Sequence, residues 1–341
     1  MENRCERALS ISETLLETVN HVLPRHVNPL GTLHGGIMLQ WMITAATLTS
    51  MRVARAPTVL AGMDHIFFLS PVRVGENAVI TSWIDYIGRS SMEVTVRVEA
   101  ENPIEGSRRL TTFSHMVLVA VDDELRPKPV GACITPRSSV EEELYEAAIR
   151  RREHRMARIS TRKEAVRDVS PPRPLDPRYA VSSIRFAYPE DSIFHNAVFA
   201  GKLMYYLDEL AGIIGLRYSG GPVVTAAVDA TDFYAPIRVG ESMNMYAALT
   251  YVGRSSMEVT IKVIARKEET GEEKHTTTSY FTVVALDEHG RPRPVKQFKV
   301  QEPWQAELYK RAEERRRRRL ELLDAIKKSS FPGLPKNLRT R

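Results

Sequence analysis

The sequence has few cysteines and no long apolar stretch. Its 341 residues include two cysteines, Cys5 and Cys133, whose spacing is not typical of a metal site. We therefore expect neither a disulfide framework nor a zinc site, and a reducing cytoplasm as the natural compartment. The N-terminal residues carry charges but no apolar core followed by a small-residue cleavage site, so we expect no secretion signal.

Positive charge is in modest excess and is concentrated near the C-terminus. The formal net charge is +6, and Arg315–Arg319 is an unbroken run of arginines. Nucleic acid or an acidic membrane surface could bind such a run. However, no aromatic residues alternate with these arginines to form a stacking platform. We expect a solvated helix face flanked by Glu313, Glu314 and Glu321, and no nucleic-acid partner; attraction for a polyphosphate ligand is a third alternative.

The two halves of the sequence repeat each other at a spacing of 165 residues. Tyr86–Val98 reads YIGRSSMEVTVRV, and Tyr251–Val263 reads YVGRSSMEVTIKV. A repeat of this length is a whole domain rather than a solenoid unit. The apolar content of 43% is ordinary for globular proteins. We therefore predict two domains, residues 1–158 and 159–341, and positions that differ between matched halves become informative.

Each half contains a helix that is apolar on most of its circumference. The first runs from Gly35–Gly36 to about Val53, and the second from Gly201 to about Arg217. Helices of this kind are wrapped by other elements. The longest apolar run, residues 37–51, is shorter than the ~20 residues that span a bilayer. Since the matching stretch in the second half is charged, we expect buried helices and no transmembrane segment.

Alternating apolar and polar residues follow each helix. Met92–Val98 and Met257–Val263 alternate with period two, which is typical of an antiparallel strand with one buried face. Thr111–Val121 and Thr276–Leu286 indicate a final long strand. One buried helix followed by several such strands predicts an α+β fold, in which a curved antiparallel sheet wraps a single helix.

Each half ends in a charged helix. Val140–Arg158 and Trp304–Lys328 contain the similar segments ELYEAAIRRR and ELYKRAEERR, here with the spacing reduced by one residue. The first of these helices, together with the proline-rich stretch Pro171–Pro177 behind it, is the expected interdomain linker.

The segment before the first helix carries candidate functional groups. His26–Gly36 reads HVNPLGTLHGG. A glycine pair lets the backbone approach a ligand closely, and the first turn of a helix presents unpaired N–H groups. A carbonyl oxygen that becomes negative during a reaction could bind there, with Asn28 and His34 pointing to the same place. The alternative is a glycine-shaped turn in which Asn28 and His34 satisfy local backbone groups.

The second half carries an acid inside its apolar helix. Asp208 lies among LMYYL and ELAGII, where a carboxylate is costly unless it is paired or functional. At three matched positions one half is polar and the other apolar: Asn28 with Ile193, His34 with Phe199, and Asp208 with Ile43. If the halves pack about a pseudo-twofold axis, one composite site keeps every polar side chain and the other keeps none. A purely structural Asp208, paired within its own half, is the alternative.

These motifs also carry a family resemblance. NPLGTLHGG before an apolar helix, LDELAG in the second half and GRSSMEV in both halves resemble the acyl-CoA thioesterases of the hotdog fold, most closely the double-hotdog cytosolic acyl-CoA hydrolases. The resemblance implies a tandem double hotdog, a trimer of such chains, and one active site that uses an asparagine from the first domain and an aspartate from the second. Those two functions fall on Asn28 and Asp208, and His34 and Gly35 match the carbonyl-binding part.

The resemblance implies hydrolysis of a thioester. Asp208 would act as general base on water or as nucleophile, Asn28 would orient the water or the thioester, and the Gly35 N–H, helped by His34, would polarise the carbonyl. No metal or redox cofactor is needed. Two basic turns could bind the phosphates of coenzyme A, or could be repeat-preserved structural turns. They comprise Arg89, Ser90, Arg254 and Ser255.

We therefore expect a cytoplasmic, homo-oligomeric acyl-CoA thioester hydrolase of lipid metabolism that releases free carboxylic acid and coenzyme A. Two alternatives remain. A hydroxyacyl-thioester dehydratase would pair a histidine with an acid, but the proline-rich histidine motif of such enzymes is not found around His34. A non-catalytic acyl-CoA-binding protein would use the apolar cavity for binding only.

Overall fold

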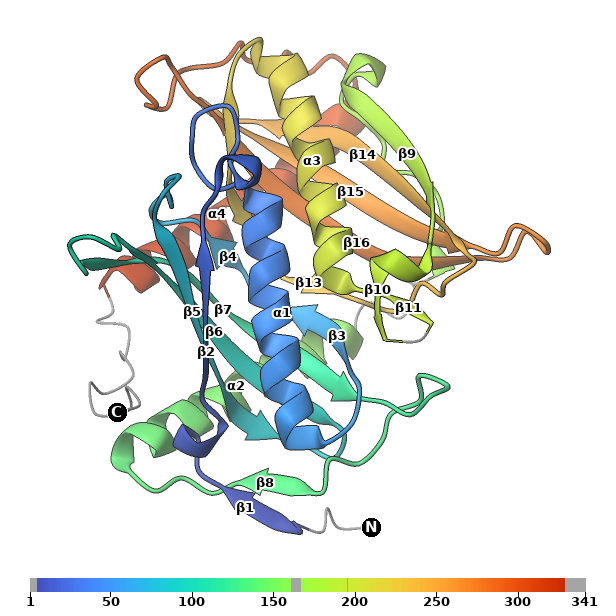
Figure 1. The fold of residues 1–341 in the computed structure, drawn as a ribbon. Coiled ribbons are helices and arrows are strands. Elements are labelled where there is room, and N and C mark those ends of the chain that lie inside the picture. Colours follow the sequence, from blue (N-terminus) through green and yellow to red (C-terminus); the bar gives the residue numbers. More distant parts are fainter. Residues whose placement is uncertain (1–4, 161–166, 195, 329–341) are drawn as a thin grey trace.

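The protein is built from two six-stranded antiparallel sheets, each packed on one long helix (Figure 1). The structure is a computed structural model and describes residues 5–160, 167–194 and 196–328. The predicted α+β double hotdog is confirmed.

The first sheet has the order β13-β3-β7-β6-β5-β2 and the second β4-β12-β16-β15-β14-β9. The strands from the first half are β2 (Leu16–His21), β3 (Thr58–Met63), β4 (Ile66–Phe67), β5 (Asn77–Ile87), β6 (Ser91–Glu101) and β7 (Arg108–Ala120). Those from the second half are β9 (Ala180–Phe186), β12 (Val223–Val228), β13 (Thr231–Asp232), β14 (Ser242–Val252), β15 (Ser256–Arg266) and β16 (Glu273–Ala285). Outside the two large sheets lie β1 (Arg7–Leu9), β8 (Ala132–Ile134), β10 (Ser192–Phe194) and β11 (Ala197–Val198). The long helices are α1 (Gly35–Ala54), α2 (Ser139–Ser160), α3 (Ala200–Ser219) and α4 (Pro303–Lys328).

Each half lends a two-residue strand to the sheet of the other half. β4 follows β3 in the chain but pairs with β12, where Ile66 lies opposite Val228. β13 follows β12 but pairs with β3, where Thr231 lies opposite Met63. Backbone hydrogen bonds therefore complete each sheet with a strand from the other half of the chain.

The two core helices, α1 and α3, pack directly against each other (Figure 1, blue and yellow). An added Cβ atom on Gly36 would lie 2.9 Å from Tyr205 Cα, and one on Gly201 would lie 3.2 Å from Gln40 Cα. Only glycine permits so close an approach of two backbones. These contacts run in opposite chain directions, so the start of each helix lies beside the second turn of the other. Among the described residues, no helix is both long and apolar enough to cross a membrane.

The outer faces of the sheets are also buried, which differs from the prediction of one buried face per strand. In β6, Val94, Val96 and Val98 face the core and are fully buried, as the alternation predicts. Glu93 and Thr95 face the other way but are buried as well. The reason is that α2 and α4 lie behind the two sheets (Figure 1) and cover those faces.

In the arginine run of α4, some side chains face solvent and others contact the sheet that the helix covers. Arg319 donates to both oxygens of Asp229 at 2.6 Å and to Glu258 at 3.3 Å, and Arg315 donates to Glu258 at 2.6 Å. The expected solvated face therefore holds for Arg316–Arg318, which are exposed, and is wrong for Arg315 and Arg319. Residues four apart share one face of a helix, and this face points to the sheet.

The same arrangement recurs in the first half. Arg155 on α2 contacts Glu93 and donates to Asp64 at 3.2 Å, while Arg151 donates to Glu93 at 2.7 Å. The shared ELY segments of the two helices thus mark a common way of fastening a charged helix to the back of a sheet.

A disulfide joins Cys5 to Cys133, contrary to the expectation of no disulfide framework. Their Cα atoms lie 5.5 Å from each other, because β1 and β8 form a parallel pair in which Arg7 lies opposite Ala132. The sequence separation of 128 residues concealed this proximity. In a reducing compartment the same pair would be held as two thiols.

Reduction of this disulfide is expected to lower the free energy of unfolding by about 2–4 kcal/mol, because the bond closes a long loop in the unfolded chain. Thermal unfolding with and without a thiol reductant measures the effect. A Cys5→Ser variant should melt at about the temperature of the reduced parent protein, whether or not the reductant is present. An equal response of the variant and the parent protein to reductant would contradict the prediction.

Candidate active site

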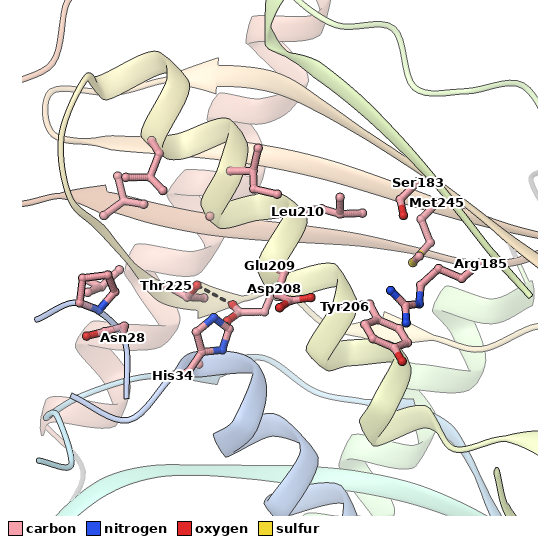
Figure 2. Close-up of a pocket in the computed structure, with 17 residues that line it drawn as sticks. Asn28, His34, Ser183, Arg185, Tyr206, Asp208, Glu209, Leu210, Thr225 and Met245 are labelled. Atoms are coloured by element: carbon pink, nitrogen blue, oxygen red, sulfur yellow. Dashed lines mark hydrogen bonds and ion pairs between the residues drawn. The ribbon is translucent and has the colours of Figure 1, made fainter. Parts of the chain in front are cut away.

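A cavity of about 420 Å³ lies where the start of α1 meets the second turn of α3. Its lining comes from both halves of the chain. Four of the residues predicted from sequence border it: Asn28, His34, Gly35 and Asp208. Figure 2 shows Asn28 and His34 on one side of this cavity and Arg185 and Tyr206 on the other. The antiparallel contact of the two helices, made possible by Gly36, is what brings Asp208 to the first half.

Asp208 is a buried carboxylate with three polar neighbours. One oxygen, Oδ2, accepts a hydrogen bond from the Gly36 N–H at 2.6 Å and lies 3.4 Å from His34 Nδ1. The other, Oδ1, accepts from Thr225 Oγ1 at 2.5 Å. The start of a helix carries partial positive charge, which favours an ionised acid there.

Burial is the dominant influence on the protonation of Asp208. Removal from water raises the pKa of its carboxyl group above the ordinary value of 3.8. The neighbouring His34 and the hydrogen bonds from Thr225 and Gly36 oppose this rise. Two of its three polar partners, Gly36 and His34, belong to the first half, so Asp208 is not paired only within its own half.

His34 caps the N-terminus of α1. Its Nδ1 atom accepts from the Gly36 N–H at 3.1 Å. The same N–H group also donates to Asp208, so His34 and Asp208 share one backbone donor. The Gly35 N–H is the first of the helix, and such groups have no intrahelical partner.

Asn28 stabilises its own loop and also borders the cavity. Its Oδ1 accepts from the backbone N–H groups of Leu30 at 3.0 Å and Thr32 at 3.3 Å, and its Nδ2 donates to Thr32 Oγ1 at 2.9 Å. An asparagine amide has two N–H donors, so one of them is not used in these contacts. The alternative in which Asn28 satisfies local backbone groups describes its contacts, and its part in the reaction stays a prediction.

Sequence reasoning missed Thr225 and Arg185. Thr225 matches Leu60 in the first half, so it is a fourth position at which only one half is polar, and the same comparison could have found it. Arg185 lies on β9, the exposed edge strand of the second sheet, with its guanidinium 4.1 Å from the centre of the Tyr206 ring. No motif surrounds Arg185, and the sequence carried no signal for it.

The candidate phosphate-binding residues lie elsewhere, in two hairpin turns. None of the four borders the cavity. The backbone carbonyls of Arg89 and Arg254 accept hydrogen bonds from Val130 and Val295, respectively. Those of Ser90 and Ser255 accept from Ala120 and Ala285, so both halves use the turn in the same way. This geometry favours the interpretation as repeat-preserved structural turns.

The fold also assembles one set of possible metal ligands, although none was found in the sequence. Asp85, Glu93 and His115 lie together beneath α2. Burial raises the pKa of Asp85 to about 7, against the opposing effect of Arg151, and burial lowers the pKa of His115 well below its usual value. Because arginines already contact both carboxylates, this cluster is better described as the charged attachment of α2.

Two hotdog domains joined by antiparallel core helices, with one polar cavity between them, define a double-hotdog protein. The family model of the thioesterase superfamily matches residues 30–107 and 195–272. The human cytosolic acyl coenzyme A thioester hydrolase is 32% identical over 81% of this chain and 75% of its own length. The chain therefore belongs to the thioesterase superfamily, together with the cytosolic acyl coenzyme A thioester hydrolases.

Solved structures show related folds. An acyl-ACP thioesterase from Bacteroides thetaiotaomicron superposes with a TM-score of 0.51 over 81% of this chain and all of its own, at 11% identity. That likeness concerns the fold alone. A hexameric acyl-CoA thioesterase is 37% identical over 45% of this chain and 97% of its own, with a TM-score of 0.43.

Proposed function

We propose that this protein hydrolyses acyl-CoA thioesters at a single composite site between its two hotdog domains, residues 1–158 and 159–341. It is an acyl-CoA thioester hydrolase by homology, since the relatives that establish its family carry that name. The observation that supports the composite site is the buried Asp208 carboxylate, which contacts the start of a helix from the other half. This arrangement needs residues from both halves, Asp208 from the second and Gly36 and His34 from the first.

In the proposed reaction, ionised Asp208 removes a proton from water, and the resulting hydroxide attacks the thioester carbonyl carbon. The Gly35 N–H, helped by His34, stabilises the oxyanion, and Asn28 orients the water or the thioester. When the C–S bond breaks, the coenzyme A thiolate takes the proton held by Asp208, and a carboxylic acid remains. Direct attack by Asp208, through an anhydride that water then hydrolyses, is the alternative.

Arg185 is better placed than the turn residues to contact coenzyme A. It borders the cavity and is exposed, so its planar guanidinium can bind a phosphate without first losing a buried partner. Phosphate binding by Arg89, Ser90, Arg254 and Ser255 stays a prediction, although none of them borders the cavity of its own chain.

The pH dependence of hydrolysis follows from the raised pKa of Asp208. The ionised carboxylate is the active form, so kcat/KM is expected to fall as the pH is lowered through a value above 3.8. Thr225 hydrogen-bonds the ionised form and lowers this pKa. A Thr225→Val variant should therefore move the acid limb upward by about one pH unit. Steady-state rates measured across pH test this, and an unmoved limb would show that Asp208 does not control the profile.

The proposed activity is tested by the release of coenzyme A thiol from saturated acyl-CoAs of increasing chain length. Hydrolysis gives one free thiol for each carboxylic acid. A dehydratase would instead remove water from a 3-hydroxyacyl-CoA and release no thiol. Binding of acyl-CoA without thiol release at any chain length would favour the non-catalytic alternative and refute the proposed function.

We further propose a cytoplasmic homotrimer. The human, mouse and rat relatives are named cytosolic. β9 forms one edge of the second sheet and exposes Ile184 and Phe186, with Tyr188 exposed just beyond its end. Exposed apolar side chains on an edge strand favour association. Light scattering should give three times the chain mass of 38.6 kDa, and the mass of a single chain would contradict this proposal.

A further inference from the structure

A second cavity, of about 290 Å³, lies where the start of α3 meets the second turn of α1. The repeat relates it to the first cavity. At four of the positions that supply polar groups to the first cavity, the second has Ile193 for Asn28, Phe199 for His34, Ile43 for Asp208 and Leu60 for Thr225. The second cavity therefore lies at the position equivalent to the first, but apolar side chains replace these four polar residues.

No charged side chain is among the described residues that line this second cavity. The Phe199 ring lies against the start of α3, since an added Cβ atom on Gly201 would meet it at 2.5 Å. In the first cavity the corresponding place holds the contact between Gly36 and Asp208. Among the described residues, the second cavity thus has no carboxylate to activate water and no cation to bind a phosphate, and most of its lining is apolar.

Leu125 provides an independent indication that this lining is maintained. Its side chain borders the second cavity, and its backbone has a φ of 66°, in the left-handed region. The matching residue in the second half is Gly290, with a φ of 74°. Leucine is strained in this conformation and glycine is not. A strained leucine in the lining of a cavity indicates that leucine, rather than glycine, is favoured at this position.

We infer that the second cavity binds one aliphatic chain, either a free fatty acid or the acyl part of a thioester, and does not hydrolyse it. The volume lies near the lower end of ligand cavities, which suits a chain but not a whole acyl-CoA. The exposed Pro127 and Pro236 border the cavity, so its mouth is reached from solvent between two loops. The choice of occupant rests on the proposed function, because it assumes that the equivalent first cavity takes an acyl chain.

A photoreactive ten-carbon fatty acid with a terminal diazirine tests the inference in the full chain. After irradiation, peptide mapping should find the label on β3 and on residues 197–203, around the second cavity. Ala235 lies in a loop and borders only this cavity, so Ala235→Phe should fill it. Each buried methylene contributes roughly fourfold to affinity, and labelling should fall by about tenfold or more when two or more are displaced.

A matched control fills the first cavity instead. An added Cβ atom on Gly212 meets nothing within 4 Å, so Gly212→Phe has room to enter the first cavity and should leave labelling of the second unchanged. Leu125→Gly should reduce labelling about fourfold while the melting temperature stays the same or rises, because backbone strain is removed. A merely structural leucine would lower the melting temperature without changing the labelling.

Label found only at the first cavity, or label at the second cavity that survives Ala235→Phe, would overturn the inference. Labelling needs no thioester hydrolysis, so a failure of the proposed enzyme activity would be seen separately. In an Asp208→Asn background, competition by unlabelled decanoic acid and by decanoyl-CoA distinguishes the two sources of the chain. Competition by either compound supports the inference, whereas competition by neither shows that the label was not held in an aliphatic-chain site.

Discussion

Replacing Asp208 with asparagine is expected to lower kcat for acyl-CoA hydrolysis by about 100-fold or more, as loss of a general base commonly does. Asparagine keeps the shape and can still accept the Gly36 N–H, so substrate binding should change little. The measurement is the rate of coenzyme A release under saturating substrate. Full activity in this variant would refute the composite site.

The fold of the Asp208→Asn variant should be intact. Because burial raises the pKa of Asp208, the contribution of this group to stability is present at low pH and is lost as the pH rises through the raised pKa. A neutral amide avoids that loss, so at neutral pH the melting temperature should stay the same or rise.

Asp229→Asn is the matched control. Asp229 is also a buried aspartate of the second half with a pKa raised by burial, but its carboxylate accepts hydrogen bonds from Arg319 of its own half. Its replacement removes the carboxylate partner of the buried Arg319 guanidinium, so the melting temperature should fall despite the raised pKa of Asp229, and kcat should stay nearly unchanged. The two variants thus separate chemistry from stability, and a large loss of kcat in a folded Asp229→Asn protein would contradict this division.

Replacing Arg319 with methionine is expected to destabilise the protein by about 3–5 kcal/mol. The guanidinium is buried and bound to Asp229 and Glu258, and methionine fills similar space without a charge. Asp229 then loses its arginine partner in a buried environment, where an unpaired carboxylate is costly. Denaturant unfolding at neutral pH measures the change.

The arginine run itself supplies the control for this second experiment. Arg317 belongs to the same run but is exposed, so Arg317→Met should change stability by no more than about 0.5 kcal/mol. If Arg317→Met destabilised the protein as much as Arg319→Met, the prediction that the buried arginine stabilises the fold through its ion pairs would be wrong.

The sequence predicted the core of the fold well because its pattern is strong. The helix expected from Gly35–Gly36 to about Val53 is α1, Gly35–Ala54, and the one expected from Gly201 to about Arg217 is α3, Ala200–Ser219. Both are apolar around most of their circumference, and in both the second residue is a glycine that the packing requires. Helix ends are normally less certain than this.

What the sequence did not show depends on contacts between distant residues. The pairing of Arg319 with Asp229 required knowing which face of α4 meets the sheet, and the closeness of Cys5 and Cys133 required the pairing of β1 with β8. Arg185 lies on an edge strand, and no pattern in the sequence predicted where that strand lies in the sheet. The candidate residues Asn28, His34, Gly35 and Asp208 border one cavity, and their catalytic functions stay predictions.

The antiparallel contact of α1 and α3 has an evolutionary consequence. In a dimer of identical hotdog chains, any substitution appears in both sites at once, so neither can be lost alone. Joining the two domains in one chain removes that constraint. With two domains in one chain, Ile43 can occupy the position that Asp208 occupies in the other domain, and the two cavities need not bind the same ligand.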